Sequence, residues 1–289
     1  MPADLIDGVA IAAKIRAEVA QRTKALAATG TVPGLTVVLV GEDPASAVYV
    51  RNKEKQSVEA GMKGETIRLP ATTTQAELLA VVDRLNADAT VHGILVQMPL
   101  PGHLDPERVL ALIPAAKDVD GLTEASLGRL VRGVPGHVGC TPLGVMRLIE
   151  KYNIQTKGKR AVVIGRSTLT GMPQTILLIR KGGDATTTCA HSATPKQDLI
   201  EICREADIIV SAVGVARLIT KDHVKPGATV IDVGVSRIES KIVGDVDFDE
   251  VQKVAGAITP MPGGTGPMTI ACLLENTLQA ARMLGAFPA

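Results

Sequence analysis

Short apolar runs alternate along this chain with longer segments that have helical periodicity or helix-capping residues. In the first half, the β-branched runs at residues 35–40 and 93–97 predict buried strands. Helices are predicted at residues 7–28, 46–61 and 74–85, the last of which opens with a capping box. This order of strands and helices predicts a parallel sheet.

A second alternating series begins after residues 135–142, a segment rich in proline and glycine that we interpret as a hinge. A last helix, with Pro267 in its first turn, is expected to pack on the first domain. The alternation predicts an α/β protein with helices on both faces of parallel sheets. Its strands are predicted at residues 160–165, 185–190, 207–213 and 228–233, and its helices at 143–152, 170–181, 196–204 and 267–284.

Composition narrows the possible functions. The 289 residues are 46% hydrophobic and 21% charged, with a net charge of +1, so nothing favours binding to nucleic acid or an anionic membrane. The chain shows no signal peptide and no apolar run of ~20 residues, and we expect a cytoplasmic protein. The four cysteines and five histidines lack disulfide or metal-ligand spacing, so neither a disulfide framework nor a metal site is predicted.

Tyr49 and Lys53 stand four residues apart in a predicted helix, which places both side chains on one face. A phenol and an ammonium on one face can hold a flat substrate and move a proton. The chain has only two Tyr, two Phe and no Trp, so an aromatic ring beside a lysine is notable. The alternative interpretation is an amphipathic helix whose lysine stem covers apolar surface.

The segment from Gly165 to Gly171 joins a predicted buried strand to a helix, as in dinucleotide-binding folds. The glycines permit close approach of the backbone, and the helix N-terminus offers free N–H groups to phosphate. The next strand ends at Ser192 without an acid for a ribose hydroxyl, and Arg166 can pair with a 2′-phosphate, so NADP is predicted. A plain turn with a solvated arginine is the alternative.

Three other segments are candidates for substrate binding. Gln97 ends a predicted strand, where open α/β sheets bind ligands. A carboxylate in Asp118–Gly121 can accept paired hydrogen bonds from a heterocycle, although a solvated turn is the commoner meaning of Asp–Gly. The loop Pro262-Gly263-Gly264 can lie flat against a ligand, or can be only a tight connection.

Together these segments resemble the family of bifunctional methylenetetrahydrofolate dehydrogenase/methenyltetrahydrofolate cyclohydrolase enzymes (the FolD family). The likeness runs from about residue 10 to residue 284, with five motifs in the family's order. The motifs are Tyr49–Lys53, Val96–Pro101, Asp118–Gly121, Gly165–Ser167 with Gly171 and Pro173, and Pro262–Gly264 with Gly266–Thr269.

The resemblance implies a folate-binding catalytic domain of residues 1–139 plus 267–289. It also implies a Rossmann-like NADP-binding domain of residues 140–266 that mediates a homodimer. Its activity would be NADP-dependent oxidation of 5,10-methylenetetrahydrofolate, followed by hydrolysis of the methenyl product to 10-formyltetrahydrofolate.

For the folate side, the resemblance implies that Tyr49 stacks on the aminobenzoyl ring and that Gln97 bonds to Lys53. Asp120 would grip the pterin edge, and the loop at 262–264 would also contact substrate. Hydride transfer needs positioning more than a proton acceptor, whereas hydration of the methenyl carbon needs proton transfer. We therefore predict that Lys53 is the general base of the cyclohydrolase step.

For the cofactor side, the resemblance implies that Arg166, Ser167 and Ser192 surround the ribose phosphate, in a site that includes Gly165 and Gly171. Ala193 stands where the family often has a basic residue, which leaves Arg166 with less help at the 2′-phosphate. NADP is the predicted cofactor and NAD the alternative.

Two other functions use some of the same residues. A short-chain dehydrogenase also has Tyr-x-x-x-Lys, but its cofactor glycines precede the tyrosine, whereas Gly165 follows Tyr49 by more than a hundred residues. A non-catalytic folate- or dinucleotide-binding module would keep the glycines and Asp120. It would not need Lys53 and Gln97 together.

Overall fold

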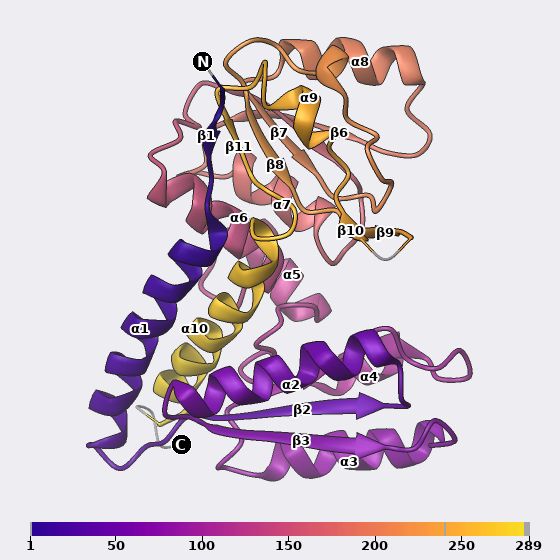
Figure 1. Cartoon of the computed structure of the whole chain (residues 1–289). Helices are drawn as coiled ribbons and strands as arrows, with labels where there is room; N and C mark the ends of the chain where they lie inside the picture. The colour runs from indigo at the N-terminus through magenta and orange to yellow at the C-terminus, as the bar shows by residue number, and fades with distance from the viewer. Residues whose placement is uncertain (1, 240, 286–289) are drawn as a thin grey trace. The chain divides into compact units, whose positions relative to one another are not determined.

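A computed structural model of the chain describes residues 2–239 and 241–285. The chain divides into two compact units, one built from residues 2–13 and 141–269 and the other from residues 14–140 and 270–285. We call them the six-stranded unit and the three-stranded unit after their main sheets (Figure 1). The predicted class, two α/β domains with parallel sheets, is confirmed.

The N-terminal residues belong to the six-stranded unit, which differs from the predicted domain of residues 1–139 plus 267–289. β1 (Asp4–Leu5) pairs in parallel with β11 (Ala257–Ile258), at the edge of that unit's sheet. Two-residue strands have no periodicity, so the sequence pattern gives no sign of this pairing.

The sheet of the three-stranded unit has the order β3-β2-β4, and both pairings are parallel. β2 (Gly34–Val40) and β4 (Gly93–Val96) are buried throughout, as predicted from their apolar runs. β3 (Lys63–Leu69) escaped prediction because glycine and charged residues interrupt its sequence. The unit's helices are α2 (Pro44–Glu59), α3 (Gln75–Ala87), α4 (Pro106–Leu112) and α5 (Glu124–Arg132), with most of α1 (Gly8–Ala27) and α10 (Thr265–Gly285).

Local capping explains where two of these helices begin. The Asp43 carboxylate accepts the N–H of Ser46 at 2.7 Å at the start of α2. At the start of α3, the Glu77 carboxylate accepts the N–H of Thr74 at 2.8 Å, while the Thr74 hydroxyl accepts the N–H of Glu77 at 3.3 Å. This reciprocal pair confirms the predicted capping box.

The sheet of the six-stranded unit has the order β1-β11-β8-β7-β5-β6, and its pairings are parallel. β5 (Arg160–Ile164) lies between β6 (Thr186–Ala190) and β7 (Ile208–Ser211), and β8 (Thr229–Asp232) follows β7. Because the chain crosses to opposite sides of β5, the carboxyl ends of β5, β6 and β7 flank a topological switch point. Such a point is the usual ligand site of a doubly wound sheet.

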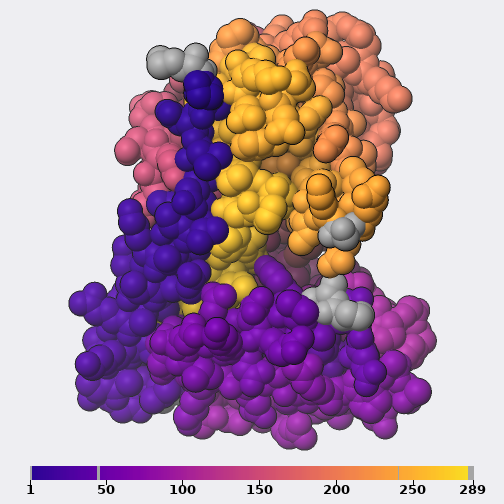
Figure 2. All heavy atoms as spheres, viewed as in Figure 1, coloured from indigo at the N-terminus to yellow at the C-terminus, as the bar shows by residue number. Residues whose placement is uncertain are grey.

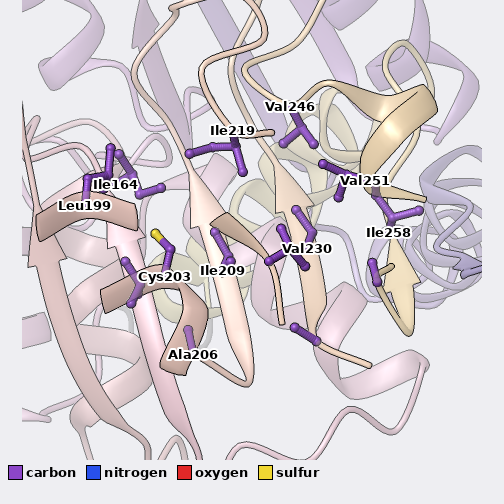
Figure 3. Packing of buried hydrophobic residues seen from close by; sticks show 14 of the residues in the cluster. Ile164, Leu199, Cys203, Ala206, Ile209, Ile219, Val230, Val246, Val251 and Ile258 are labelled. Carbon is purple, nitrogen blue, oxygen red and sulfur yellow. The ribbon is translucent and has the colours of Figure 1, made fainter. Parts of the chain in front are cut away.

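A buried apolar cluster fixes α8 (Lys196–Glu205) and α9 (Phe248–Val251) of the six-stranded unit onto this sheet (Figure 3). Leu199 and Cys203 of α8 and Val251 of α9 pack with strand residues such as Ile209 and Val230. The same unit includes α6 (Cys140–Lys151), α7 (Gly171–Ile179), the 3₁₀ turn Lys221–His223, and the hairpin of β9 (Ser236–Ile238) and β10 (Lys241–Val243).

The β9–β10 hairpin stands at the surface of its unit, where its segment is drawn in orange (Figure 2). Its apolar side chains Ile238 and Ile242 are exposed. Across the described residues, we find no helix with the length and apolar content needed to cross a bilayer.

Candidate functional site

Lys53 and Gln97 form the polar centre of the three-stranded unit. Lys53 lies on α2, only 4% exposed, and its Nζ donates to Oε1 of Gln97 at 2.9 Å. The same Nζ lies 4.8 Å from the centroid of the Tyr49 ring, one turn earlier on α2, within range of a cation–π contact. The structure thus brings together three residues that the sequence analysis selected, two on α2 and one directly after β4.

The Gln97 side chain is held in one orientation. It follows β4 directly, and its backbone N–H continues the ladder by donating to the Val38 carbonyl at 2.9 Å. Its Nε2 donates to the Met98 carbonyl at 2.7 Å, which leaves Oε1 to face Lys53. An amide fixed at both atoms can position an amine without exchanging protons with it.

Asp120 reaches this end of the sheet through a short extended segment beside β4. Asp118 forms a parallel bridge with Ile94, and the Ile94 N–H donates to the Lys117 carbonyl at 2.9 Å. Two residues further on, Asp120 is near enough to Lys53 for each charge to affect the other's pKa. The Cys140 thiol lies against Asp120 and donates to the Val119 carbonyl at 3.3 Å.

Burial and charge act in opposite directions on this pair. Burial lowers the pKa of Lys53, and the charges of Asp120 and Cys140 partly offset this by favouring the ammonium. Burial raises the pKa of Asp120, while Lys53 opposes that shift. Both shifts favour the neutral forms, so the neutral Lys53 amine forms more readily than that of a solvated lysine.

The neighbours of Asp120 in its motif have structural roles. The Lys117 ammonium donates to the carbonyls of Leu85, Asn86 and Asp88 at 2.7–3.0 Å, at the C-terminal end of α3. The Asp118 carboxylate accepts the N–H of Thr123 at 2.9 Å. Sequence alone could not separate these capping residues from Asp120.

The six-stranded unit contains a pocket of 460 Å³ at its topological switch point. Loops after β5, β6 and β7 line it, together with the start of α8. The predicted residues Gly165, Arg166, Ser167 and Ser192 all line this nucleotide pocket. Its lining also includes His191, Thr194 and Lys196, which the sequence analysis did not select.

Gly165 and Gly171 serve close packing of the backbone. Gly165 has a φ of 122°, and a Cβ there would lie 2.5 Å from the Ala212 carbonyl oxygen. A Cβ on Gly171 would lie 2.1 Å from the Gly165 carbonyl oxygen, so this glycine lets α7 approach β5. Gly171 is absent from the pocket lining, and its contact with cofactor stays a prediction.

The start of α7 differs from the expectation of free N–H groups. Ser167 accepts the N–H groups of Thr170 and Gly171 through its hydroxyl, at 3.2 and 3.5 Å. Its carbonyl accepts the N–H of Met172 at 3.0 Å. A serine in the connecting loop therefore caps the helix, and the phosphate interaction predicted there has to compete with this cap.

The Pro262-Gly263-Gly264 loop packs against the first turn of α1, within the six-stranded unit. The Val9 N–H donates to the Gly263 carbonyl at 3.1 Å. A Cβ on Gly8 would lie 1.7 Å from the Gly264 carbonyl oxygen, and Gly263 has a φ of 110°. These contacts explain the glycines by backbone packing, and the predicted substrate contact stays a prediction.

Asn276 is a supporting residue that the sequence analysis missed. From α10, its Nδ2 donates to the carbonyls of Val119 and Val138 at 2.8 and 2.9 Å, inside the three-stranded unit. It therefore ties the segment that carries Asp120 to the last helix. The sequence signal that could have identified Asn276 is its polar side chain among the apolar positions of that helix.

The pocket fits a phosphorylated dinucleotide. It combines a positive-φ glycine after the first strand with Arg166, and neither Asp nor Glu occurs among its lining residues in the described part of the chain. A carboxylate there would hold the ribose hydroxyls of NAD and repel a 2′-phosphate. The parallel sheet and this pocket place the protein in the class of Rossmann-like dinucleotide-binding proteins.

Two family models cover most of the chain. The model described as "Tetrahydrofolate dehydrogenase/cyclohydrolase, catalytic domain" matches residues 6–120, and the corresponding NAD(P)-binding domain matches residues 139–284. The chain is 56% identical to the bifunctional protein FolD of Caulobacter vibrioides over 98% of each sequence. The chain belongs to the tetrahydrofolate dehydrogenase/cyclohydrolase family.

Solved structures agree with this assignment. The FolD methylenetetrahydrofolate dehydrogenase/cyclohydrolase of Campylobacter jejuni superposes with a TM-score of 0.94 at 46% identity, covering 96% of this chain and 98% of that one. The enzyme of Trypanosoma brucei, complexed with NADP cofactor and an inhibitor, gives a TM-score of 0.93 at 39% identity, with 98% of each chain covered. The predicted family is confirmed, and the short-chain dehydrogenase alternative is excluded.

Proposed function

We propose that this protein is a bifunctional one-carbon folate enzyme. It oxidises 5,10-methylenetetrahydrofolate with NADP⁺ to 5,10-methenyltetrahydrofolate and hydrolyses that product to 10-formyltetrahydrofolate. The observation that carries the proposal is the buried Lys53, bonded to Gln97 at 2.9 Å and placed beside Tyr49 and Asp120. A non-catalytic binding module has no need for a buried lysine positioned in this way.

The first step requires orientation by the protein. When bound, NADP⁺ would supply the hydride acceptor for a C–H bond of the substrate's methylene carbon, and loss of that hydride with its electron pair would leave the folate as the methenyl cation. No side chain gains or loses a proton in this step. Tyr49 offers a ring face for stacking on the aminobenzoyl group, and Asp120 offers a carboxylate that can accept hydrogen bonds from the pterin edge.

The second step requires proton transfer. Water adds to the methenyl carbon while the neutral Lys53 amine accepts a proton from that water. The hydroxyl of this adduct then loses its proton as the C=O bond forms and the bond from the carbon to N5 breaks. N5 takes up that proton, and the carbon remains as the formyl group on N10. One water is consumed and one proton is released. The lowered pKa of Lys53 suits this role, and a bound cation would favour the neutral amine further.

The proposed cofactor-binding residues are those that line the nucleotide pocket. Gly165, Arg166, Ser167 and Ser192 would contact the NADP phosphate and ribose, since all four line the pocket.

We further propose a homodimer formed through the six-stranded unit, supported by the exposed β9–β10 hairpin and by β6 at the edge of its sheet. Light scattering after size exclusion should then give twice the chain mass of 30.1 kDa.

A coupled spectrophotometric assay tests the activity. With methylenetetrahydrofolate and NADP⁺, the wild type should form NADPH and then remove the methenyl chromophore. Lys53→Met should keep NADPH formation and slow cyclohydrolase turnover by about 100-fold or more, so that the methenyl product accumulates. Lys55→Met is the matched control, because Lys55 lies on the same helix but is exposed, 3.8 Å from Glu59. Near-normal cyclohydrolase turnover in Lys53→Met would refute the assignment.

A further inference from the structure

The nucleotide pocket carries a second full positive charge besides Arg166. Lys196, the first residue of α8, lines the pocket together with Arg166, Ser167 and Ser192. Neither of the two cations forms an ion pair within residues 2–239 and 241–285. A pocket wall with two unpaired cations and no carboxylate favours an anionic group.

We propose that Lys196 joins Arg166 in recognising the 2′-phosphate of NADP. Lys196 thereby replaces the basic residue that is absent at Ala193, three positions earlier. The inference rests on the proposed use of NADP. It identifies the residue that determines the preference for the phosphorylated cofactor in this chain.

The fold gives Lys196 a defined place at the pocket. Leu199 is three residues further along α8, so both side chains lie on one face of the helix. Leu199 is buried in the apolar cluster of the six-stranded unit, and it also lines the pocket. The buried leucine therefore fixes the rotation of the helix, and this rotation keeps Lys196 on the pocket side.

The turn before α8 is also ordered by its own hydrogen bonds. The His191 N–H donates to the Thr194 hydroxyl at 3.0 Å, and the Thr194 N–H donates to the His191 carbonyl at 2.8 Å. His191 Nδ1 accepts the N–H of Ala193 at 3.3 Å. This closed turn leads from the end of β6 to α8, so that Lys196 lines the same pocket as Ser192, where the uncharged Ala193 cannot supply a charge.

The charges around Lys196 are compatible with this role. Asp198 lies in the first turn of α8, but it is exposed and does not line the pocket. A 2′-phosphate carries between one and two negative charges near neutral pH, enough to engage both cations. Because Lys196 is exposed, salt should weaken its contribution more than it would that of a buried contact.

Calorimetric titration of the full chain with NADP⁺ and with NAD⁺, without folate, tests the proposal. The two ligands differ only in the 2′-phosphate, so the comparison isolates that group. Lys196→Met should weaken NADP⁺ binding about tenfold and leave NAD⁺ binding unchanged. Lys196→Arg should retain the preference for NADP⁺. Lys181→Met, a substitution of an exposed lysine outside the pocket, should change neither affinity.

Three outcomes would overturn the inference in distinguishable ways. Unchanged NADP⁺ affinity in Lys196→Met excludes a contact with the 2′-phosphate. An equal loss for both ligands assigns Lys196 to a group common to them. If the wild type binds NADP⁺ no better than NAD⁺, the proposed cofactor fails along with this inference. Steady-state kinetics provide a second readout, since only the KM for NADP⁺ should rise in Lys196→Met while kcat is retained.

Discussion

The chemistry proposed for Lys53 depends on the fraction of its side chain that is neutral. Removal from water favours the amine, and the nearby Asp120 favours the ammonium. Gln97 holds Nζ through an uncharged oxygen, so it positions the amine without adding charge. A neutral partner is therefore the appropriate choice for a lysine that has to accept a proton.

Gln97→Glu tests this interpretation with a side chain of nearly the same size. A carboxylate placed where Oε1 lies, 2.9 Å from Nζ, should raise the pKa of Lys53, because a nearby negative charge favours the ammonium. The cyclohydrolase rate should fall at neutral pH, and the inflection of its pH–rate profile should move to higher pH. Gln97→Leu removes the contact without adding a charge, and it should lower the rate without an upward move of the inflection. An unmoved profile in Gln97→Glu would contradict the role of Lys53 as the base.

At the scale of single elements, α3 depends on a residue distant in sequence. Lys117 donates to three carbonyls at the C-terminal end of this helix, groups that no later turn of the helix can satisfy. The ammonium also has the sign that suits the negative end of a helix dipole. This contact connects α3 to the segment that delivers Asp120.

Lys117→Met should therefore lower the free energy of unfolding by about 1–3 kcal/mol, the usual effect of losing hydrogen bonds to a charged group. The midpoint of urea denaturation should move to lower concentration with an unchanged slope. Lys55→Met, on an exposed face of α2, should leave the midpoint almost unmoved. A Lys117→Met midpoint equal to that of wild type would show that water replaces the lysine without loss.

The elements that the sequence predicted well are those with a strong local signal. β2 and β4 are continuous apolar runs, and α3 opens with a capping box that forms as expected. β3 was missed because its apolar residues are few, and its place is set by pairing with every residue of β2. α4 was missed although Asp105 and Pro106 are ordinary start signals, because seven residues show little periodicity.

The site residues that could be predicted from the sequence are also those with a local signal. Lys53 could be selected because helical spacing places it on one face with Tyr49, and Gln97 because it follows a strand end, where open α/β sheets bind ligands. Lys196 could not, because its position depends on the closed turn after β6 and on the burial of Leu199. Ser167 was assigned to the cofactor, yet its hydroxyl also caps α7, a contact that depends on the conformation of the loop. Residues placed by tertiary packing carry no local pattern.

At the scale of the whole molecule, two buried carboxylates join several strands of the six-stranded unit. Asp245 accepts the Ser211 hydroxyl at 2.9 Å and the N–H groups of Val213 and Val215 at 2.8 and 2.9 Å. Both valines line the nucleotide pocket. Asp232 is 2% exposed and accepts the N–H groups of Gly234, Asp245 and Val246 at 2.9–3.0 Å. The pair therefore fixes the loop after β7 that forms one wall of the pocket.

Asp232 should make the stability of the molecule depend on pH. Burial raises its pKa from 3.8 to about 6, with a contribution from Asp245, although its hydrogen bonds act in the opposite direction. Between these two values the folded state binds more protons than the unfolded state, so the free energy of unfolding falls as the pH rises. The loss amounts to about 3 kcal/mol in total, and it is complete roughly one pH unit above the folded pKa of about 6.

Asp232→Asn isolates this effect, since an amide does not titrate. Its amide nitrogen would face a backbone N–H, so the variant should be less stable than wild type overall. The informative quantity is the fall in the free energy of unfolding between pH 4 and pH 7, measured by urea denaturation. This fall should be smaller in Asp232→Asn by up to about 3 kcal/mol. Asp249→Asn, a substitution of an exposed acid on α9, should keep the wild-type fall. If Asp232→Asn also shows the wild-type fall in the free energy of unfolding, the prediction is wrong. Asp232 would then be ionised in the folded protein throughout this pH range, because its hydrogen bonds outweigh its burial.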